Sequence, residues 1–194
     1  MNFAEAVDAD LSVIKRPDKT AEAGVIVNAV LSRSILKTEF SKDLVETSIP
    51  LDSSLYTQTI DLSALVSPLV RFRKWKYVKM FGATRYLNYI DPQNVFVPGS
   101  WQQQDGYYMI GSSMTIIPSS SASSLLVGYY QYAPNLTGTE AHWFLDICPY
   151  AIVYQAIGEL LITMGDAANG KIYKAMGDDM YKIAVNDFKD QITY

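Results

Sequence analysis

The spacing of apolar residues changes twice along the chain and divides it into a helical, an extended and a second helical region. In the first region, apolar side chains recur every three or four positions over residues 1–16 and again from Lys19 to about Phe40. This period predicts two N-terminal helices, each with one buried face. Pro17 is expected to end the first helix, and Asp18 is a suitable N-cap for the second.

The middle region, residues 43–136, has the features of β-structure. Its apolar runs are short, rich in β-branched and aromatic residues, and bounded by Gly, Pro and Ser: Leu55–Ile60, Trp75–Phe81, Tyr107–Ile110, Met114–Ile117 and Leu125–Tyr132. The residues Gly111-Ser112-Ser113 predict a hairpin between the third and fourth of these runs. We therefore expect one small antiparallel sheet.

Helical spacing returns in the last region and predicts two C-terminal helices. The first runs from Asp146, a good N-cap, to Met164, and the second from about Ala167 to Asp190, followed by a tail over residues 188–194. The final helix is predicted to carry four apolar side chains on one face: Ile172, Met176, Met180 and Ile183. Gly170 and Gly177 weaken that helix in isolation, so packing on neighbours must hold it. The predicted fold class is α+β, a single domain over residues 1–194 in which a helical bundle (an N-terminal and a C-terminal helix pair) carries an inserted small antiparallel β-sheet.

Composition narrows the functional classes. The 194 residues are 49% hydrophobic and 19% charged, which is typical of a folded globular chain. The formal net charge of −4 argues against a dedicated nucleic-acid-binding protein, whose affinity would come from clustered Lys and Arg. The single cysteine, Cys148, excludes an intrachain disulfide. No uncharged apolar run approaches the roughly 20 residues of a transmembrane helix, and no signal-peptide pattern opens the chain.

Candidate catalytic and metal-binding residues are few, and each has a structural interpretation. His142 is the only histidine, and the sequence shows no nucleophile and acid to accompany it, so we expect it to cover the C-terminal helix pair. Cys148 is expected to be a small buried residue at a helix start. The acidic pairs Asp8/Asp10 and Asp178/Asp179 lack the spacing of a cation-binding loop and are expected to be solvated surface. The sequence thus predicts no catalytic residue, no metal and no cofactor.

A basic run from Arg71 to Arg85 contrasts with the acidic balance of the chain. It contains the residues Arg71, Arg73, Lys74, Lys76, Lys79 and Arg85. In a regular strand, Arg71, Arg73 and Lys79 share one face with Trp75 and Tyr77, and Lys74 and Lys76 lie on the other. Three interpretations stay open: an edge strand whose lysines prevent aggregation, a contact with an acidic protein surface, or a contact with DNA.

The chain has fourteen tyrosines. Tyrosine gives a large contact area at a low entropy cost and is enriched in protein interfaces. In the absence of a catalytic motif, this density favours a protein–protein assembly module.

Several segments resemble those of the head-to-tail adaptor (connector, or head-completion) proteins of tailed bacteriophages. The resemblance covers about residues 20–190 and rests on a strand with its following turn, a hairpin, a strand that ends in Pro-x-Leu, and the closing helices: Phe72–Val78 with Tyr86–Pro92, Tyr107–Pro118, Leu126–Leu136, and Ala151–Asp166 with Tyr173–Phe188. The Gly residues of the last helix and the insertion Leu51–Leu69 depart from the family pattern.

The resemblance implies a non-enzymatic virion protein of the neck, between capsid and tail, assembled in the host cytoplasm. Such adaptors form a homo-oligomeric ring, usually of twelve subunits, beneath the portal protein. The ring seals the DNA exit, offers a platform for a tail or neck protein, and lets genomic DNA pass without specific binding. The family commonly places its C-terminal segment against the portal, which implies portal contacts for Met176, Tyr181, Phe188 and Tyr194.

Three alternatives remain open at this point. The chain could be another neck or tail ring component, such as a tail terminator or tail-tube protein, which would be expected to have more sheet. It could be a tail-associated peptidoglycan hydrolase, although none of its six glutamates lies in a recognisable motif. It could also bind surface glycans through Trp75, Trp101 and Trp143, which are scattered along the chain.

Overall fold

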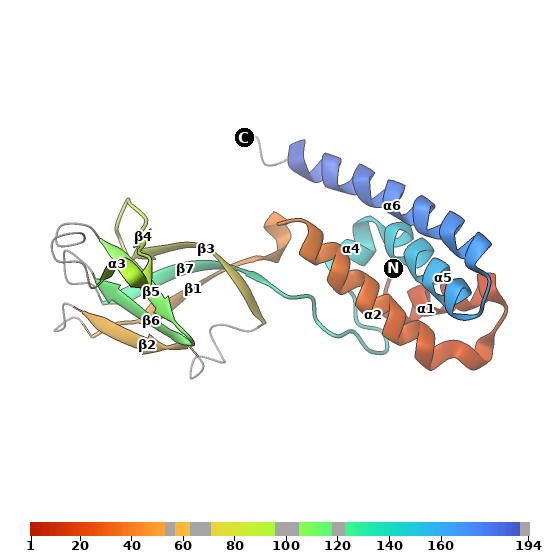
Figure 1. Ribbon diagram of the computed structural model, residues 1–194, viewed down its shortest axis with the longest axis horizontal. Helices are drawn as coiled ribbons and strands as arrows, with labels where there is room; N and C mark the ends of the chain where they lie inside the picture. The colour runs from red at the N-terminus through yellow and green to blue at the C-terminus, as the bar shows by residue number, and fades with distance from the viewer. Residues whose placement is uncertain (53–56, 63–70, 96–104, 118–122, 191–194) are drawn as a thin grey trace. The chain divides into compact units, whose positions relative to one another are not determined.

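A computed structural model of residues 1–194 describes the chain except residues 53–56, 63–70, 96–104, 118–122 and 191–194 (Figure 1). It confirms the mixed α+β class. The chain forms two compact units, a helical unit made of Met1–Lys42 and Tyr132–Tyr194 and a β unit made of Asp43–Gln131. The β unit is therefore inserted in sequence between two helical segments. In the described part of the chain, no helix is long and apolar enough to cross a membrane.

The helical unit is organised around one central helix, α5. The helices of this unit are α1 (Phe3–Ile14), α2 (Thr20–Lys37), α4 (Trp143–Ile147), α5 (Pro149–Thr163) and α6 (Ala167–Asp190). Helix α5 packs against α1, α2, α4 and α6 and is buried on most of its circumference, as expected for a helix that is apolar all round (Figure 1). Its buried side chains include Val153, Ile157 and Leu160 of the predicted stripe, whereas Tyr150 at its start is 53% exposed.

The N-terminal helix pair forms with different ends from those predicted. Asn2 and Glu5 make a capping box that begins α1, and Lys15 in the left-handed conformation ends it. A short 3-10 turn, Pro17–Lys19, connects it to α2. Asp18 does not cap α2, because its carboxylate forms an ion pair with Arg16 at 2.8 Å instead.

The C-terminal segment contains a short helix before the predicted pair. Helix α4 is capped by His142, whose Nδ1 accepts a hydrogen bond of 3.2 Å from Phe144 N–H. Asp146 lies inside α4 and forms an ion pair with the N-terminal amino group, so the predicted helix start at Asp146 is wrong. The bounds of the final helix, Ala167–Asp190, are as predicted.

Glycines set the distance between α5 and α6. A Cβ atom on Gly177 would lie 2.8 Å from the backbone N of Gln155, and one on Gly170 would lie 2.7 Å from the backbone O of Gly158. These glycines lie on the α5-facing side of α6 and permit an approach that no other residue would allow. The residues that weaken the helix in isolation therefore enable the packing that holds it.

The β unit contains two sheets where the sequence predicts one. The first sheet has the strand order β1-β7-β3, with all neighbours antiparallel, and the second has the order β2-β6-β5-β4, with β4 parallel to β5. The strands are β1 (Leu44–Pro50), β2 (Gln58–Asp61), β3 (Phe72–Met80), β4 (Asn88–Tyr89), β5 (Gly106–Ile110), β6 (Ser113–Ile117) and β7 (Ser124–Gln131), and a helical turn, α3 (Pro92–Val95), follows β4. Strand β1 was not among the predicted strands. The run predicted at Leu55–Ile60 is only partly described, because residues 53–56 lie outside the described part.

The predicted hairpin is confirmed. Strands β5 and β6 pair antiparallel, with Tyr107 opposite Ile116 and Met109 opposite Met114, and Gly111 takes a positive φ of 60° in the turn. Apolar side chains of both sheets form the core of the β unit: Ile49, Val78, Met80, Leu125, Val127 and Tyr129 from the first sheet and Tyr107, Met114 and Ile116 from the second. The two sheets therefore pack face to face over one shared core.

Candidate interaction surfaces

The final helix exposes the apolar face that the sequence predicts. Ile172, Met176, Met180 and Ile183 are 38–59% exposed. We call these four residues the α6 stripe. The buried face of α6 carries Gly170, Gly177, Tyr181, Ala184 and Phe188 instead. Apolarity alone does not identify the packed face of this helix, because that face carries glycines for close approach.

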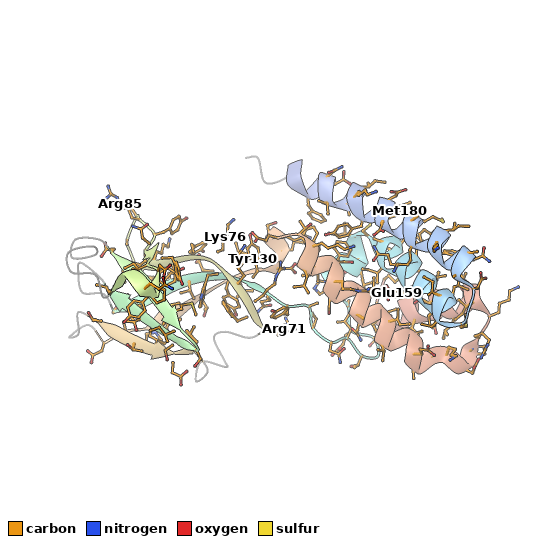
Figure 2. The ribbon with its side chains drawn as sticks, viewed as in Figure 1. Arg71, Lys76, Arg85, Tyr130, Glu159 and Met180 are labelled. Carbon is orange, nitrogen blue, oxygen red and sulfur yellow. The ribbon has the colours of Figure 1, made fainter. Side chains whose placement is uncertain are left out.

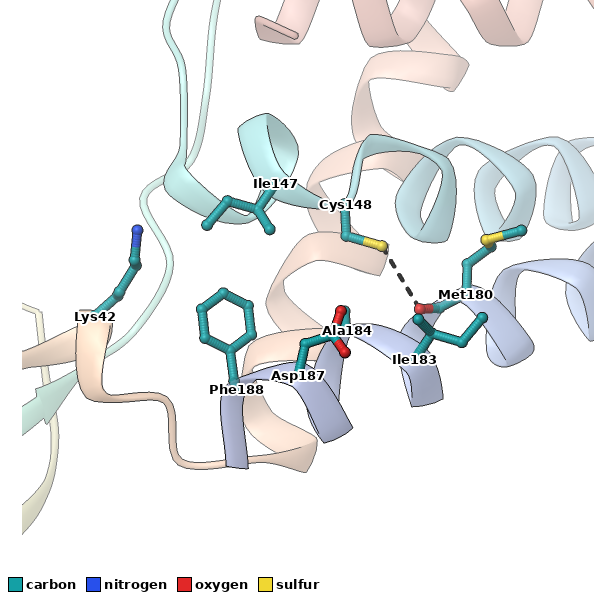
Figure 3. A pocket seen from close by; sticks show the side chains of 8 residues that line it. All are labelled: Lys42, Ile147, Cys148, Met180, Ile183, Ala184, Asp187 and Phe188. Atoms are coloured by element: carbon teal, nitrogen blue, oxygen red, sulfur yellow. Dashed lines mark hydrogen bonds between the residues drawn. The ribbon is translucent and has the colours of Figure 1, made fainter. Parts of the chain in front are cut away.

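A groove of about 330 Å³ adjoins the α6 stripe (Figure 3). Its lining residues come from the end of α4, the C-terminal half of α6, and Lys42: Lys42, Ile147, Cys148, Met180, Ile183, Ala184, Asp187 and Phe188. Cys148 Sγ donates a hydrogen bond of 3.6 Å to the backbone O of Met180. Burial raises the pKa of the Cys148 thiol, so the structure gives no support for an acidified nucleophile.

Of the predicted portal-contact residues, Met176 is accessible and lies in the α6 stripe. Tyr181 and Phe188 are buried and lie in the core of the helical unit, and Tyr194 lies outside the described residues. The Tyr181 hydroxyl donates to the backbone O of Ser34 at 2.9 Å and lies 2.8 Å from Thr38 Oγ1.

Phe188 is fixed among aromatic rings. Its ring packs edge-on against Phe40 and Trp143 at centroid distances of 5.6 and 5.4 Å. Phe188 and Tyr181 therefore anchor α6 within the helical unit, and the surface that α6 offers is the stripe.

The basic run forms an edge strand, β3, but not with the predicted alternation. Register shifts lie between Phe72 and Lys74 and between Trp75 and Tyr77, and they mark two bulges. Trp75 lies on the core side of the strand, where its ring centroid is 4.4 Å from that of Phe72. Its Nε1–H donates a hydrogen bond of 3.2 Å to Met109 Sδ. Tyr77 lies on the opposite side. The predicted shared face of Trp75 and Tyr77 is therefore wrong, because each bulge reverses the alternation of the residues that follow it.

The outer side of β3 combines tyrosines with lysines. Tyr77 lies against Gly128 of β7, where a Cβ atom would come within 2.5 Å of its ring, and its hydroxyl donates to Glu46 of β1. Burial, and then the bond to Glu46, raise the pKa of Tyr77 to about 12. Tyr86 packs on the Tyr77 ring at 5.3 Å.

The predicted basic residues separate into two groups. Lys76 Nζ lies 5.9 Å from the centroid of the Tyr130 ring, and Lys79 Nζ lies 6.0 Å from the centroid of the Tyr77 ring. In Figure 2, Lys76 and Arg85 point to the same side of the β unit. We call the surface made by Lys74, Lys76, Tyr77, Lys79, Arg85 and Tyr86, with the buried Tyr130 beneath Lys76, the β3 outer face. Arg71 precedes β3 at a positive φ of 52°, donates to Gln131 Oε1 at 3.1 Å, and does not belong to this surface. Arg73, partly exposed, falls at the first bulge.

A second groove, which the sequence analysis missed, lies where α1 begins beside α2. It has a volume of about 540 Å³, and an adjoining pocket of about 170 Å³ extends it along α1 to Asp8. We call it the α1 groove, lined by Phe3, Ala4, Val7, Asp8, Thr20, Ala21, Gly24, Val25, Asn28, Asn135, Leu136, Thr137 and Gly138. The signal in the sequence was Val25, an apolar residue off the buried face of its helix, which is 70% exposed.

The titratable residues show one unexpected group. Asp10 is fully buried, whereas the sequence analysis placed it on the surface with Asp8. Neither carboxylate oxygen of Asp10 has a hydrogen-bond partner among the described residues, and burial raises its pKa to about 8. Among these residues no group of three or more His, Cys, Asp or Glu side chains could hold a metal ion.

Comparison of the sequence with protein-family models and with curated proteins gives no match. The functional assignment therefore depends on the surfaces described above and on the local resemblance in the sequence.

Proposed function

We propose that the chain is a non-enzymatic virion protein, a head-to-tail adaptor that forms a ring beneath the portal, seals the DNA exit and offers a platform for the tail. The order of its parts supports this proposal, because a β unit inserted between two helical segments is the layout that the resemblance implies. The proposal assigns the chain no catalytic chemistry.

The observation that carries the proposal is the α6 stripe. Helix α6 is anchored through Tyr181 and Phe188 on one side and exposes four large apolar side chains on another. Isolated exposed apolar residues are ordinary, but an aligned row along one helix is typical of a docking surface. Two of the four are methionines, whose flexible side chains adapt to a partner groove.

In this proposal the α6 stripe docks in an apolar groove of the portal. Of the residues predicted to contact the portal, Met176 makes this contact. The groove beside the stripe receives a side chain of the portal in return, because Ile147, Met180 and Ile183 already give it an apolar lining. The tail-side partner would be a tail or neck protein.

The test is cryo-electron microscopy of the purified protein mixed with the portal from the same genome. We expect a stacked ring of cyclic symmetry with α6 against the portal. The matched variants are Met176→Asp with Met180→Asp, which should abolish the complex, and the exposed control Asp179→Asn, which should retain it.

Substitutions in the stripe are a cleaner test than deletion of residues 187–194, because that deletion also removes Phe188 from the core. No complex at micromolar concentrations with the unmodified protein would refute the portal assignment. A later neck or tail ring component would then become the better assignment.

A further inference from the structure

We propose that the β3 outer face of one subunit binds the α1 groove of a second copy, so that copies associate head to tail. This inference deepens the proposed ring and rests on it for its biological setting. The two surfaces lie on different units of the chain. A contact between two unlike surfaces is heterologous and closes into a ring when its rotation permits, whereas a contact between like surfaces gives only dimers.

The first argument is the charge of the β3 outer face. Residues 43–131 contain six basic and six acidic residues, and all six basic residues lie between positions 71 and 85. The acidic residues are spread over the unit at positions 43, 46, 52, 61, 91 and 105. Glu46, an acidic side chain that the structure places against this face, accepts the Tyr77 hydrogen bond. The face is therefore a positive surface on an acidic protein.

The second argument distinguishes a protein partner from a nucleic acid. Proteins that bind single strands offer aromatic faces on which bases stack. Here Tyr77 lies between Gly128 and the Tyr86 ring, and Lys76 lies over the Tyr130 ring. The Tyr77 and Tyr130 rings are thus in use within the subunit, and the groups that the face offers to a partner include the charges of Lys76 and Arg85 beside the exposed Tyr86. These charges suit carboxylates.

The third argument is the complementary character of the α1 groove. The lining of the groove includes Asp8, which is exposed, and contains no Lys or Arg among the described residues. Two further residues with exposed carboxylates adjoin residues of the lining. Glu5 belongs to the capping box of α1, and Glu140 is held next to Phe3 because the Phe3 N–H donates to the Glu140 backbone O at 2.9 Å.

Apolar contact adds to the charge complementarity. Phe3 and Val25 line the groove, and Val25 is 70% exposed. A tyrosine of the β3 outer face, such as Tyr86 at 60% exposure, has the size and the amphipathic character to enter it. Carboxylates near an apolar groove and cations around an exposed tyrosine form a matched pair of surfaces.

The test uses two variants, each of which removes one surface. Lys76→Glu with Arg85→Glu disables the β3 outer face, and Asp8→Lys with Val25→Arg disables the α1 groove. All four side chains are at least partly exposed, so circular dichroism and thermal melts should match those of the unmodified chain. Sedimentation velocity at tens of micromolar protein and low salt measures the association.

The unmodified chain should form species larger than dimers, and association should weaken about tenfold or more when NaCl is raised to 0.5 M. Each variant alone should be monomeric. An equimolar mixture of the two should give dimers and nothing larger, because one intact β3 outer face meets one intact α1 groove. Assembly of either variant like the unmodified chain, or a monomeric unmodified chain at low salt, would overturn the proposal.

Two further measurements separate this inference from others. A fluorescent thirty-nucleotide single strand should not bind at physiological salt, and tight binding that Lys76→Glu with Arg85→Glu abolishes would make the face a nucleic-acid site and refute the protein contact. Head-to-tail association without portal binding would support this inference and refute the adaptor assignment. If both variants still form rings on the portal, the adaptor assignment would be supported and this inference refuted.

Discussion

Replacing Asp10 by Asn should change how the stability of the helical unit depends on pH. Asp10 lies on α1, is fully buried, and has a pKa raised by burial to about 8. In the unfolded chain its pKa is about 3.9. Between these two values the folded state holds a proton that the unfolded state releases, so the folded state binds more protons and its stability falls as the pH rises.

The magnitude follows from the size of the shift. Each pH unit between the two pKa values changes the free energy of unfolding by about 1.4 kcal/mol. From pH 5 to pH 7 the Asp10 carboxyl should therefore remove about 3 kcal/mol of stability. The stability that the protonated Asp10 carboxyl preserves is fully present below about pH 4. It is lost as the pH rises to about 8. The asparagine side chain has a similar volume and does not ionise, so the variant should lack this loss.

The assay is urea unfolding of both proteins at pH 5, 6, 7 and 8, followed by circular dichroism at 222 nm, which reports mainly on the helical unit. The quantity to compare is the free energy of unfolding of the variant minus that of the unmodified chain, because other titrating groups cancel in this difference. It should rise by about 3 kcal/mol between pH 5 and pH 7. The control Asp8→Asn removes an exposed carboxylate from the same helix. A difference for Asp10→Asn that stays flat with pH, like that of the control, would show that Asp10 is ionised and solvated in the folded chain.

Two further substitutions test the packing of α5. Gly177→Ala should destabilise the helical unit by roughly 1–3 kcal/mol despite the higher helix propensity of Ala, because the new methyl would collide with the backbone of Gln155. The control Ala175→Gly, on the exposed side of the same helix, should cost only about 1 kcal/mol. Urea unfolding compares the two variants. Arg33→Met should remove the paired 2.7 Å hydrogen bonds to the Glu159 carboxylate. Burial alone would raise the pKa of Glu159, but Arg33 and then Lys174 lower it. The variant should therefore lose about 1 kcal/mol above about pH 5, and the loss should fade as the pH falls through the lowered pKa, which the same titration would measure.

Local signals in the sequence were sufficient for several elements. The hairpin of β5 and β6 follows from two β-rich runs on either side of Gly111, which supplies the positive φ of the turn. The bounds of α6 follow from helical spacing and from the Gly165-Asp166 break before it. Each of these elements depends on interactions between residues close in sequence, so its signal can be recognised in one amino-acid sequence.

The packed face of α6 and the alternation of β3 could not be predicted in the same way. On α6, the packed side was decided by how closely α5 approaches, and this distance depends on glycines that score as neither apolar nor polar. On β3, the two bulges exist because of its pairing with β7, and this partner lies about fifty residues away in the chain. Both features depend on tertiary contacts. One lies on the helix that carries the proposed function and the other on the strand that carries the further inference.

The tyrosines show how the structure refines an argument from composition. Their number favoured an assembly module, but Tyr129 and Tyr181 are core residues that stabilise the two units. Tyr86, beside the basic strand, is 60% exposed, and Tyr150, at the start of α5, is 53% exposed. Composition alone could not identify these two as accessible tyrosines. An interface that uses tyrosine should therefore respond to Tyr86→Ala and Tyr150→Ala without loss of fold, whereas Tyr181→Phe should lower stability by about 1 kcal/mol through its lost hydrogen bonds and leave association unchanged.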